Sequence, residues 1–490
     1  MSKAIIYLLY FTLYTLVLLF FGKSGFKKTK NIRGFFVAGN SLGLVASILT
    51  FTATWFSAAS MQGLSGSIFA YGYSSVLYSV VAWFLGAGLL VIMAVKLKDY
   101  DIFTVPEYFS IRYNSKILQA LGGLIIVITY VFYIIIQIRG FGIVMSELLD
   151  IHYTVSIFLV YLFIIYTTFG GLYSVSKTDG FNFGMIFLGI LLAVVIILKD
   201  IGGITLLHQK AALISSRPFP SFPYKTYKGA LIDPFSKGIT PPMVLFTSFF
   251  GWGLGLAANP QYAIRIVSAK DKKTAVKIIC MSVLILALIY IGIFIIGIGA
   301  RVLEPTIESV SSVDEVFAYT INNVIYSKIS GFILIGIAAA AISTANSQLL
   351  ILASGFTYDI YKNLFNPNIK EDRFLNLNRI FIFIAGTISL LLSIRPPESL
   401  LIFGGNIWGI FSATFLLPLY GGLYWKKATK EGAFASIIGG MMTMFLVFDK
   451  NNILGISGNS FIHPAFPSFI IAFILFITVS IYTYKKGDES

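Results

Sequence analysis

Long apolar runs recur along the whole chain and constrain its fold more than any other feature. Each run has roughly 18–25 residues, which is enough for an α-helix to cross the hydrocarbon core of a bilayer. The chain is 57% hydrophobic and only 12% charged, whereas soluble domains carry about a quarter charged residues. We therefore predict an all-α integral membrane protein of about thirteen transmembrane helices, at 3–22, 42–67, 74–95, 117–146, 153–173, 181–200, 240–266, 275–303, 328–352, 377–395, 398–423, 430–447 and 464–484.

The basic residues are distributed as in a membrane protein rather than a nucleic-acid-binding one. The formal net charge is +15, but most of the Lys and Arg lie in the loops on the side reached after the first span. Cytoplasmic loops carry such an excess of basic residues. We therefore expect a multi-pass protein of the cell membrane with its N-terminus outside and its C-terminus in the cytoplasm. We expect no nucleic acid partner.

The segments between the predicted spans are too short to form a soluble domain. The longest is about 201–239, so we treat residues 1–490 as a single transmembrane domain. The sequence contains no nucleophile–base set and no phosphate-binding loop, which argues against an enzyme. The three histidines lie at loop edges and predict no metal cluster. No segment indicates an obligate protein partner.

Two of the predicted spans are interrupted by small and polar residues near their middle. One is "TFTATWFSAASMQGLSGSIFAYG" (50–72) and the other is "FFGWGLGLAANPQYAIR" (249–265). Pro260 in the second removes an intrahelical hydrogen bond. The two lie five spans apart, and paired broken helices in matching halves of a chain indicate the midplane site of a secondary transporter. The alternative is that Gly and Ser only allow close helix packing.

A third segment, "AAAAISTANSQL" (338–349), carries two adjacent hydroxyls within an apolar run. Ser343 and Thr344 are separated by about 100° around a helix, so both can flank one object beside it. Neutral hydroxyls and the carbonyls of a broken helix can together surround a desolvated sodium ion. Alternatively, both hydroxyls bond back to carbonyls one turn earlier in their own helix. The spacing leaves these two interpretations open.

Several motifs resemble those of the sodium:solute symporter family. "AAAAISTANSQLLILASGFTYDIYK" resembles the family's eighth core helix, "TTFGGLYSVSKTD" the entry to the fifth, and "YWKKATKEGAFASIIGG" the basic loop near the C-terminal end. The resemblance implies a single transporter domain with the LeuT-type fold. It would have an extra N-terminal helix at 3–22, inverted five-helix repeats at 42–200 and 240–423, and two C-terminal helices at 430–484.

The resemblance also implies a set of sodium ligands. By motif, these are the carbonyls of Ala53, Phe56 and Ala340 and the hydroxyls of Ser343 and Thr344. Sodium would be co-transported, and no other metal is implied.

Asp179 matches an acidic position that the family links to sodium passage or to a second sodium. The alternative is a carboxylate that is favoured at the start of a helix by the helix dipole.

The residues after the first break are candidates for the solute site. Ser57, Ser60 and Gln62 directly follow it, and core helices one, two, three and six of the family line the solute cavity. Tyr78 falls where sugar-carrying relatives place an aromatic gate. The neighbouring Ser79 replaces an acidic sugar ligand of those relatives, which weakens a sugar interpretation.

The second broken segment resembles those of two permeases of the family. "GWGLGLAANPQ" is similar to the pattern of the proline permease, on Trp252 and Pro260, but Leu256 stands where that carrier has a substrate-binding Tyr. The continuation "PQYAIRIVSAKDKKTA" is more similar to the pantothenate permease. Both permeases carry small carboxylates.

Arg139 lies well inside a predicted span, where a cation is costly and indicates function. Its planar fork could bind a solute carboxylate with two hydrogen bonds. The alternatives are pairing with Glu147 two turns further on, or extension of the side chain to the outer surface.

Together these features predict a sodium-coupled secondary active symporter. It would import a small organic solute by alternating access, with a pantothenate-, amino-acid- or monocarboxylate-like solute favoured. One alternative is a proton-coupled carrier, although Ser and Thr hydroxyls do not titrate near neutral pH. Others are a sugar or sialic-acid symporter of the same fold, and a sensor or channel that does not pump.

Overall fold

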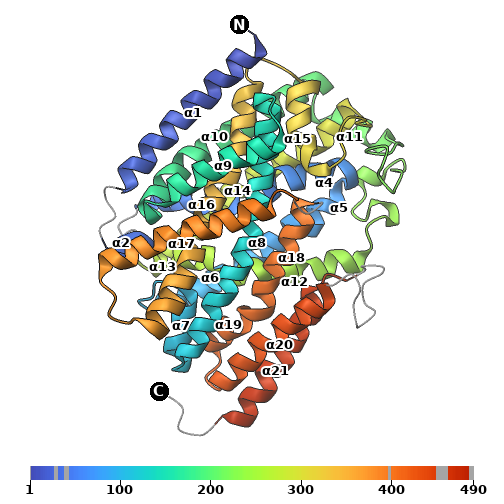
Figure 1. Ribbon diagram of the computed structural model, residues 1–490. Coiled ribbons are helices and arrows are strands. Elements are labelled where there is room, and N and C mark those ends of the chain that lie inside the picture. Colours follow the sequence, from blue (N-terminus) through green and yellow to red (C-terminus); the bar gives the residue numbers. More distant parts are fainter. Residues whose placement is uncertain (1, 27–30, 38–42, 396–398, 449–461, 485–490) are drawn as a thin grey trace.

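The computed structural model describes residues 2–26, 31–37, 43–395, 399–448 and 462–484. Within these ranges the chain is helical and contains no β-strand (Figure 1). The first part of the chain forms α1 (Lys3–Phe26), α2 (Ile32–Val37), α3 (Leu44–Trp55), η2 (Ala59–Gly63), α4 (Leu64–Tyr71), α5 (Tyr73–Ser75), η3 (Val76–Val81), α6 (Ala82–Leu97), α7 (Val105–Tyr113), α8 (Lys116–Leu149), α9 (Tyr153–Thr168) and α10 (Gly171–Ile201).

A connecting segment and the second part of the chain follow. The segment contains α11 (Ile204–Leu213), η4 (Ala230–Ile232) and η5 (Ser236–Gly238). The second part forms α12 (Pro242–Ala258), α13 (Pro260–Val267), α14 (Lys272–Leu303), η6 (Val313–Glu315), α15 (Val316–Tyr319), η7 (Thr320–Val324), α16 (Ser330–Ser354), η8 (Gly355–Phe365), α17 (Glu371–Leu392), α18 (Leu400–Thr414), α19 (Leu416–Tyr424), α20 (Lys430–Phe448) and α21 (Ala465–Thr483).

The lengths of these helices confirm an all-α membrane protein. In the described part of the chain, ten helices are long and apolar enough to cross a membrane, and an eleventh is added if the bent pair 44–55 and 59–71 forms one span. α9 has 16 residues and α12 has 17, and both lie where the sequence predicts a span. The count of thirteen stays a prediction.

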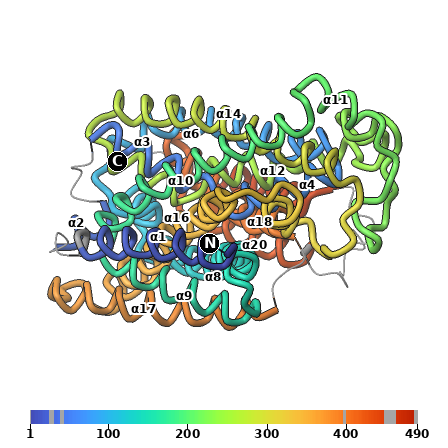
Figure 2. The backbone as a smooth tube through the Cα atoms, turned by 90° about the horizontal axis from the view of Figure 1, so that it is seen from above, coloured from blue at the N-terminus to red at the C-terminus, as the bar shows by residue number. Residues whose placement is uncertain are grey.

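The connections between long helices gather at two opposite ends of the bundle. One end, called here the α11 face, holds residues 201–242 and 303–330. The other, called here the α7 face, holds residues 97–116, 267–272 and 365–371. Figure 2 shows α11 at one end of the molecule and α2 at the opposite end.

α16 forms the centre of the bundle. Every residue of this helix except Phe332 is buried or nearly so, and it packs against α10 and α8. Gly336 allows the close approach of α10, because a Cβ there would lie 2.7 Å from the carbonyl oxygen of Met185. The polar residues of α16 are therefore enclosed by protein rather than exposed to lipid.

Candidate functional site

The first broken segment bends between α3 and η2. α3 ends at Trp55, Phe56 is extended with φ −87° and ψ 105°, and the two helical parts meet at an angle of 60°. The last carbonyls of a helix have no partner within it, so this break frees oxygens at the centre of the bundle. It lies among the Ser and Ala residues where the sequence predicts an interruption.

The five predicted sodium ligands come together at this break. Ser343 Oγ on α16 lies 2.9 Å from the carbonyl oxygen of Ala53, and Thr344 Oγ1 lies 3.2 Å from that of Phe56. Ser343 Oγ also lies 3.1 Å from the carbonyl oxygen of Ala340. All five residues are buried, so three carbonyls and two hydroxyls lie together between α3 and α16, away from bulk water.

Both sequence interpretations of the hydroxyl pair describe part of this geometry. The contact of Ser343 with Ala340 is the bond back into its own helix, while the contacts with Ala53 and Phe56 cross to α3. Thr344 also donates to the carbonyl of Thr54 at 3.3 Å. A hydroxyl that served only its own helix would not need the carbonyls of a second, broken one. The cross-helix contacts therefore favour a shared oxygen cluster.

The second broken segment turns at Asn259, between α12 and α13. Asn259 is extended, and its side chain accepts a hydrogen bond from the backbone N–H of Gln261 at 3.1 Å. Tyr130 on α8 donates to the same Asn259 oxygen. Pro260 is the first residue of α13, where its missing N–H costs nothing. The structure thus gives Pro260 a role in ending one helix and starting the next.

A buried ion pair lies next to the oxygen cluster, toward the α7 face. Arg265 Nη2 lies 3.5 Å from Asp179 Oδ2 and 2.7 Å from Ser347 Oγ. Thr50 donates to the same carboxylate at 2.5 Å. Asp179 lies well inside α10, because that helix begins at Gly171 rather than near 181 as the sequence predicts. Its carboxylate therefore faces a cation and not the start of a helix.

A second buried ion pair lies toward the α11 face. Arg139 Nη2 on α8 lies 3.1 Å from Asp314 Oδ2 and 3.1 Å from Ser312 Oγ. Asp314 belongs to the short η6, and both of its carboxylate oxygens accept the backbone N–H of Leu400 at 3.1–3.2 Å. Glu147, the predicted alternative partner, accepts a hydrogen bond from Asn322 at 2.7 Å instead.

Three of the predicted solute residues lie around the first break. Ser57 and Ser60 are buried, and Ser60 Oγ lies 3.3 Å from the hydroxyl of Tyr290 on α14. Gln62 is fully buried, and neither its side-chain oxygen nor its nitrogen has a hydrogen-bond partner. Buried polar atoms without partners are costly, so these groups are available to a bound polar solute.

Three further predicted solute residues lie at two other places. Trp252 packs edge-on against Trp83 and Trp408, with ring centroids 5.0 Å apart in each pair. Leu256 is fully buried near the end of α12, and its carbonyl accepts the N–H of Asn259. Tyr78 instead lines a separate cavity of about 180 Å³ near the start of α12, so it is not brought together with Ser57 and Ser60.

Several residues of this region escaped the sequence analysis. Asn259 directly before a proline has the pattern of a helix N-cap, and Arg265 lies inside a predicted span. Both residues could therefore have been identified from the sequence. No local pattern identifies Tyr130, Tyr290 or Asp314, because their partners are distant in the chain. Tyr290, for example, contacts Ser60, which is 230 positions away. Only the packed fold brings these groups to the two breaks.

The fold and this site define a helical membrane transporter with two broken helices and a buried oxygen cluster at the first break. The sequence model described as the sodium:solute symporter family matches residues 35–440. The chain belongs to the sodium:solute symporter family.

Relatives of known activity match along nearly their whole length. The osmoregulated proline transporter OpuE of Bacillus subtilis is 26% identical over 98% of this chain and 95% of its own. A sodium/proline symporter of Staphylococcus aureus is 26% identical over 97% of this chain and 92% of its own.

Solved structures share the fold. A Na⁺-coupled sialic acid symporter, in a substrate-bound outward-open state, aligns with a TM-score of 0.79 at 19% identity, over 99% of this chain and 100% of its own. Mhp1, a nucleobase-cation-symport-1 family transporter in a closed conformation, aligns with a TM-score of 0.56 at 14% identity, over 91% of this chain and 93% of its own.

These matches confirm the predicted class of protein and its LeuT-type fold. The chain is a multi-span membrane transporter and not an enzyme, and it couples the movement of a small organic solute to sodium.

Proposed function

We propose that the oxygen cluster between α3 and α16 is the site of the co-transported sodium ion. The observation that supports this most directly is the pair of contacts from Ser343 and Thr344 to the carbonyls of Ala53 and Phe56. The five groups are neutral oxygen donors, which suit a hard monovalent cation without adding a carboxylate that would also bind protons. Sodium would replace the hydroxyl–carbonyl hydrogen bonds and hold α3 and α16 together.

Asp179 would serve the release of this sodium rather than bind a second one. Ser347 lies one helical turn below Ser343 and contacts both Thr54 and the Arg265 guanidinium. A continuous polar row therefore leads from the cluster to Asp179. Because the guanidinium already occupies the space beside Asp179 and Ser347, a resident second sodium there would have to displace a cation.

The solute would be a small carboxylate. Two of the matching relatives are named for proline and one structural neighbour for sialic acid, and both compounds carry a carboxylate. Arg139 would supply the cation: it precedes Gly140 on α8, whose Cα lies close against Ala58 and Gln62 at the first break. Leu256 stands where the proline permease has a substrate-binding Tyr, so a carboxylate other than proline, such as pantothenate, fits this chain better.

Transport would follow alternating access between the α11 and α7 faces. The two breaks lie in corresponding helices of residues 42–200 and 240–423, which supports a division into two inverted repeats flanked by residues 3–22 and 430–484. With the basic loops on the α7 face in the cytoplasm, the N-terminus lies outside and the direction is import across the plasma membrane.

Uptake into proteoliposomes tests both the driving ion and the solute. The panel would contain pantothenate, proline, acetate, sialic acid and glucose, with sodium and proton gradients imposed separately. We expect uptake of a carboxylate driven by sodium alone. Equal uptake with either gradient would support a proton-coupled carrier. Preference for glucose would support a sugar symporter, and equilibration without accumulation would support a channel or sensor.

A double substitution tests the sodium site itself. Ser343→Ala with Thr344→Ala removes both hydroxyls, so the sodium concentration for half-maximal uptake should rise at least tenfold in a protein that still folds. Ser354→Ala is the matched control, because that hydroxyl on the same helix bonds only to the carbonyl of Ile351. Unchanged sodium dependence in the double variant would refute the assignment.

A further inference from the structure

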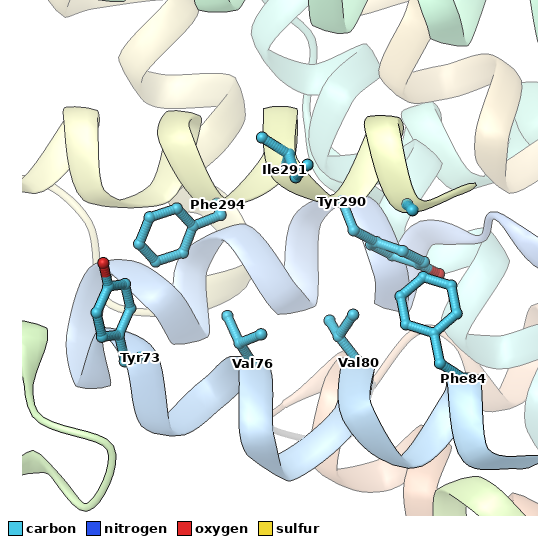
Figure 3. A pocket seen from close by; sticks show the side chains of 8 residues that line it. Tyr73, Val76, Val80, Phe84, Tyr290, Ile291 and Phe294 are labelled. Carbon is cyan, nitrogen blue, oxygen red and sulfur yellow. The ribbon is translucent and has the colours of Figure 1, made fainter. Parts of the chain in front are cut away.

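An apolar groove opens on the side of the bundle between η3 and α14. Its volume is about 300 Å³. Figure 3 shows its two walls and the aromatic rings at each end. The groove is lined chiefly by Tyr73, Val76, Val80 and Phe84 on one wall and by Tyr290 and Phe294 on the other.

The groove is long and narrow because its lining residues follow one face of a helix. Val76, Val80 and Phe84 recur at intervals of four, so their side chains lie above one another. From Tyr73 to Phe84 the wall extends about 16 Å at the usual rise of a helix. The segment 76–81 is π-helical, and such local widenings of a helix are frequent at functional sites.

The mouth of the groove faces the hydrocarbon of the bilayer. Residues 73–97 and 272–303, which form its walls, are both long and apolar enough to span a membrane. Ile291 lines the groove and is exposed, and Leu85 and Leu288 are exposed elsewhere on the same two helices. In a membrane only hydrocarbon is available to fill a recess there, and an unfilled recess would forfeit dispersion contacts along its whole lining.

One end of the groove is polar, as the head group attached to an acyl chain requires. The hydroxyl of Tyr73 lies 2.9 Å from His208 Nε2 on α11, and the ring of Tyr73 packs on Phe294 with centroids 4.9 Å apart. Tyrosines with an apolar ring and a polar tip collect where a membrane meets water. The groove thus begins at a polar pair on the α11 face and ends at the aromatic ring of Phe84.

The inner wall of the groove also touches the first break. Tyr290 is the ring between them: its hydroxyl meets Ser60 at 3.3 Å, and its ring lies 5.5 Å from that of Phe56. Trp83 packs on the same ring at 5.2 Å. A chain in the groove would therefore press on a side chain that also contacts Ser60 and Phe56 at the first break.

We propose that this groove binds one acyl chain of a membrane phospholipid, with the polar head at Tyr73 and His208 and the methyl end at Phe84. Occupation supports the ring of Tyr290 against Ser60 and Phe56. The importance of that contact for transport rests on the proposed function, whereas binding of the acyl chain does not.

Photo-labelling in nanodiscs tests the site with the full-length protein. Phosphatidylglycerol carrying a photoactivatable diazirine near the carboxyl end of its acyl chain should label peptides around Tyr73 and Phe294. The same lipid with the diazirine near the methyl end should label peptides around Phe84 and Tyr290. Labelling should saturate at one copy per chain. Labelling that is the same for both probe depths, or spread evenly over exposed helices, would overturn the proposal.

Two substitutions that fill the groove provide the matched comparison. Val80→Trp and Ile291→Trp place an indole in it from opposite walls, and each should reduce groove labelling at least fivefold. Leu288→Trp adds the same side chain on the exposed face of α14 and should leave labelling unchanged. Full labelling of a folded Ile291→Trp protein would overturn the proposal, as would capture of a second protein copy by a photo-crosslinker placed at residue 291.

Discussion

Two buried ion pairs lie on the two sides of the candidate transport site, and they differ in the structural elements that they connect. Arg265 and Asp179 lie on α13 and α10, with side chains 4% and 0% exposed. Arg139 and Asp314 are almost as buried, at 9% and 0%, but Asp314 belongs to a three-residue η6 in a connection. The first pair joins two helices, whereas the second joins a helix to a loop.

The partners of each pair extend this difference. Arg265 and Asp179 share hydrogen bonds with Thr50 and Ser347, so four helices meet at the α7-face pair. Asp314 instead binds the first N–H of α18, and the backbone of Val313 lies directly against Gly66 of α4. Equal burial therefore serves two purposes: the α7-face pair is part of the polar row beside the sodium cluster, and the α11-face pair holds a loop over the bundle.

The largest effect is expected from removing the cation of the α7-face pair. Arg265→Met would leave the Asp179 carboxylate buried without a cation, which costs about 3–5 kcal/mol of folding free energy. Combining it with Asp179→Asn removes the stranded charge, and most of the stability should return. Thermal unfolding in nanodiscs measures both variants.

The double variant also separates structure from ion release. If Asp179 assists sodium release, Arg265→Met with Asp179→Asn should fold well and bind sodium, yet import solute several-fold more slowly than the wild type. Equal melting temperatures for the single and double variants would contradict the charge argument. Normal import by the double variant would contradict the release role.

A smaller effect is expected from the α11-face pair. With Arg139→Gln, Asp314 keeps the N–H of Leu400, so the loss of stability should be about 1–3 kcal/mol. Removing a charge-assisted, two-pronged contact should weaken carboxylate binding about 10–100-fold. The amide of the same solute is the matched ligand and should lose much less. Equal losses for carboxylate and amide would show that Arg139 acts only through Asp314.

The pH dependence of solute binding tests the role of the Arg139–Asp314 pair, because Asp314 can be protonated. Burial raises the pKa of Asp314 to about 6, although Arg139 opposes this shift. Because the pKa of the unfolded carboxyl is about 3.9, the native carboxyl binds its proton at a higher pH than the unfolded one. The contribution of Asp314 to stability therefore falls as pH rises from about 4 to 6. Burial also raises the pKa of the neighbouring Glu315, in the same direction.

Protonation of Asp314 would release Arg139 toward a solute carboxylate. At fixed sodium, we expect several-fold tighter carboxylate binding at pH 5.5 than at pH 7.5. Asp314→Asn should bind tightly at both pH values, while Glu315→Gln should keep the pH dependence. Binding of the wild type that does not change with pH would contradict the competition between Asp314 and solute.

The fold could be predicted because each span and each break is marked by residues within its own short segment of the sequence. Each apolar run is long enough to span a bilayer, and Pro260, together with the Ser and Ala residues after Trp55, marks the two breaks in the sequence itself. The ends of helices were less predictable: α10 extends ten residues before the predicted span, since its first turns are polar and enclosed by α2 and α3 rather than by lipid.

The site was predictable only where one segment contains its own signal. The adjacent hydroxyls of Ser343 and Thr344 stand out in an apolar helix, and the family motif placed their carbonyl partners. The partner of Arg139 did not stand out, because Asp314 lies in a polar connection among other acidic residues, and Glu147 was closer in sequence. Long-range pairs of this kind are fixed by how the loop packs, which local spacing does not encode.

The smallest effect is expected from an exposed ion pair on the same face as Arg265. Lys272 and Asp99 lie 2.6 Å apart, but their side chains are 48% and 51% exposed. Water and salt screen such a pair, so a double-mutant cycle with Lys272→Ala and Asp99→Ala should give a coupling of under about 1 kcal/mol. The coupling should shrink further at high salt. The same cycle for Arg265 and Asp179 should give several times more and stay nearly independent of salt. Similar values for both pairs would mean that burial does not set the strength of these contacts, and the distinction between the two faces would lose its physical basis.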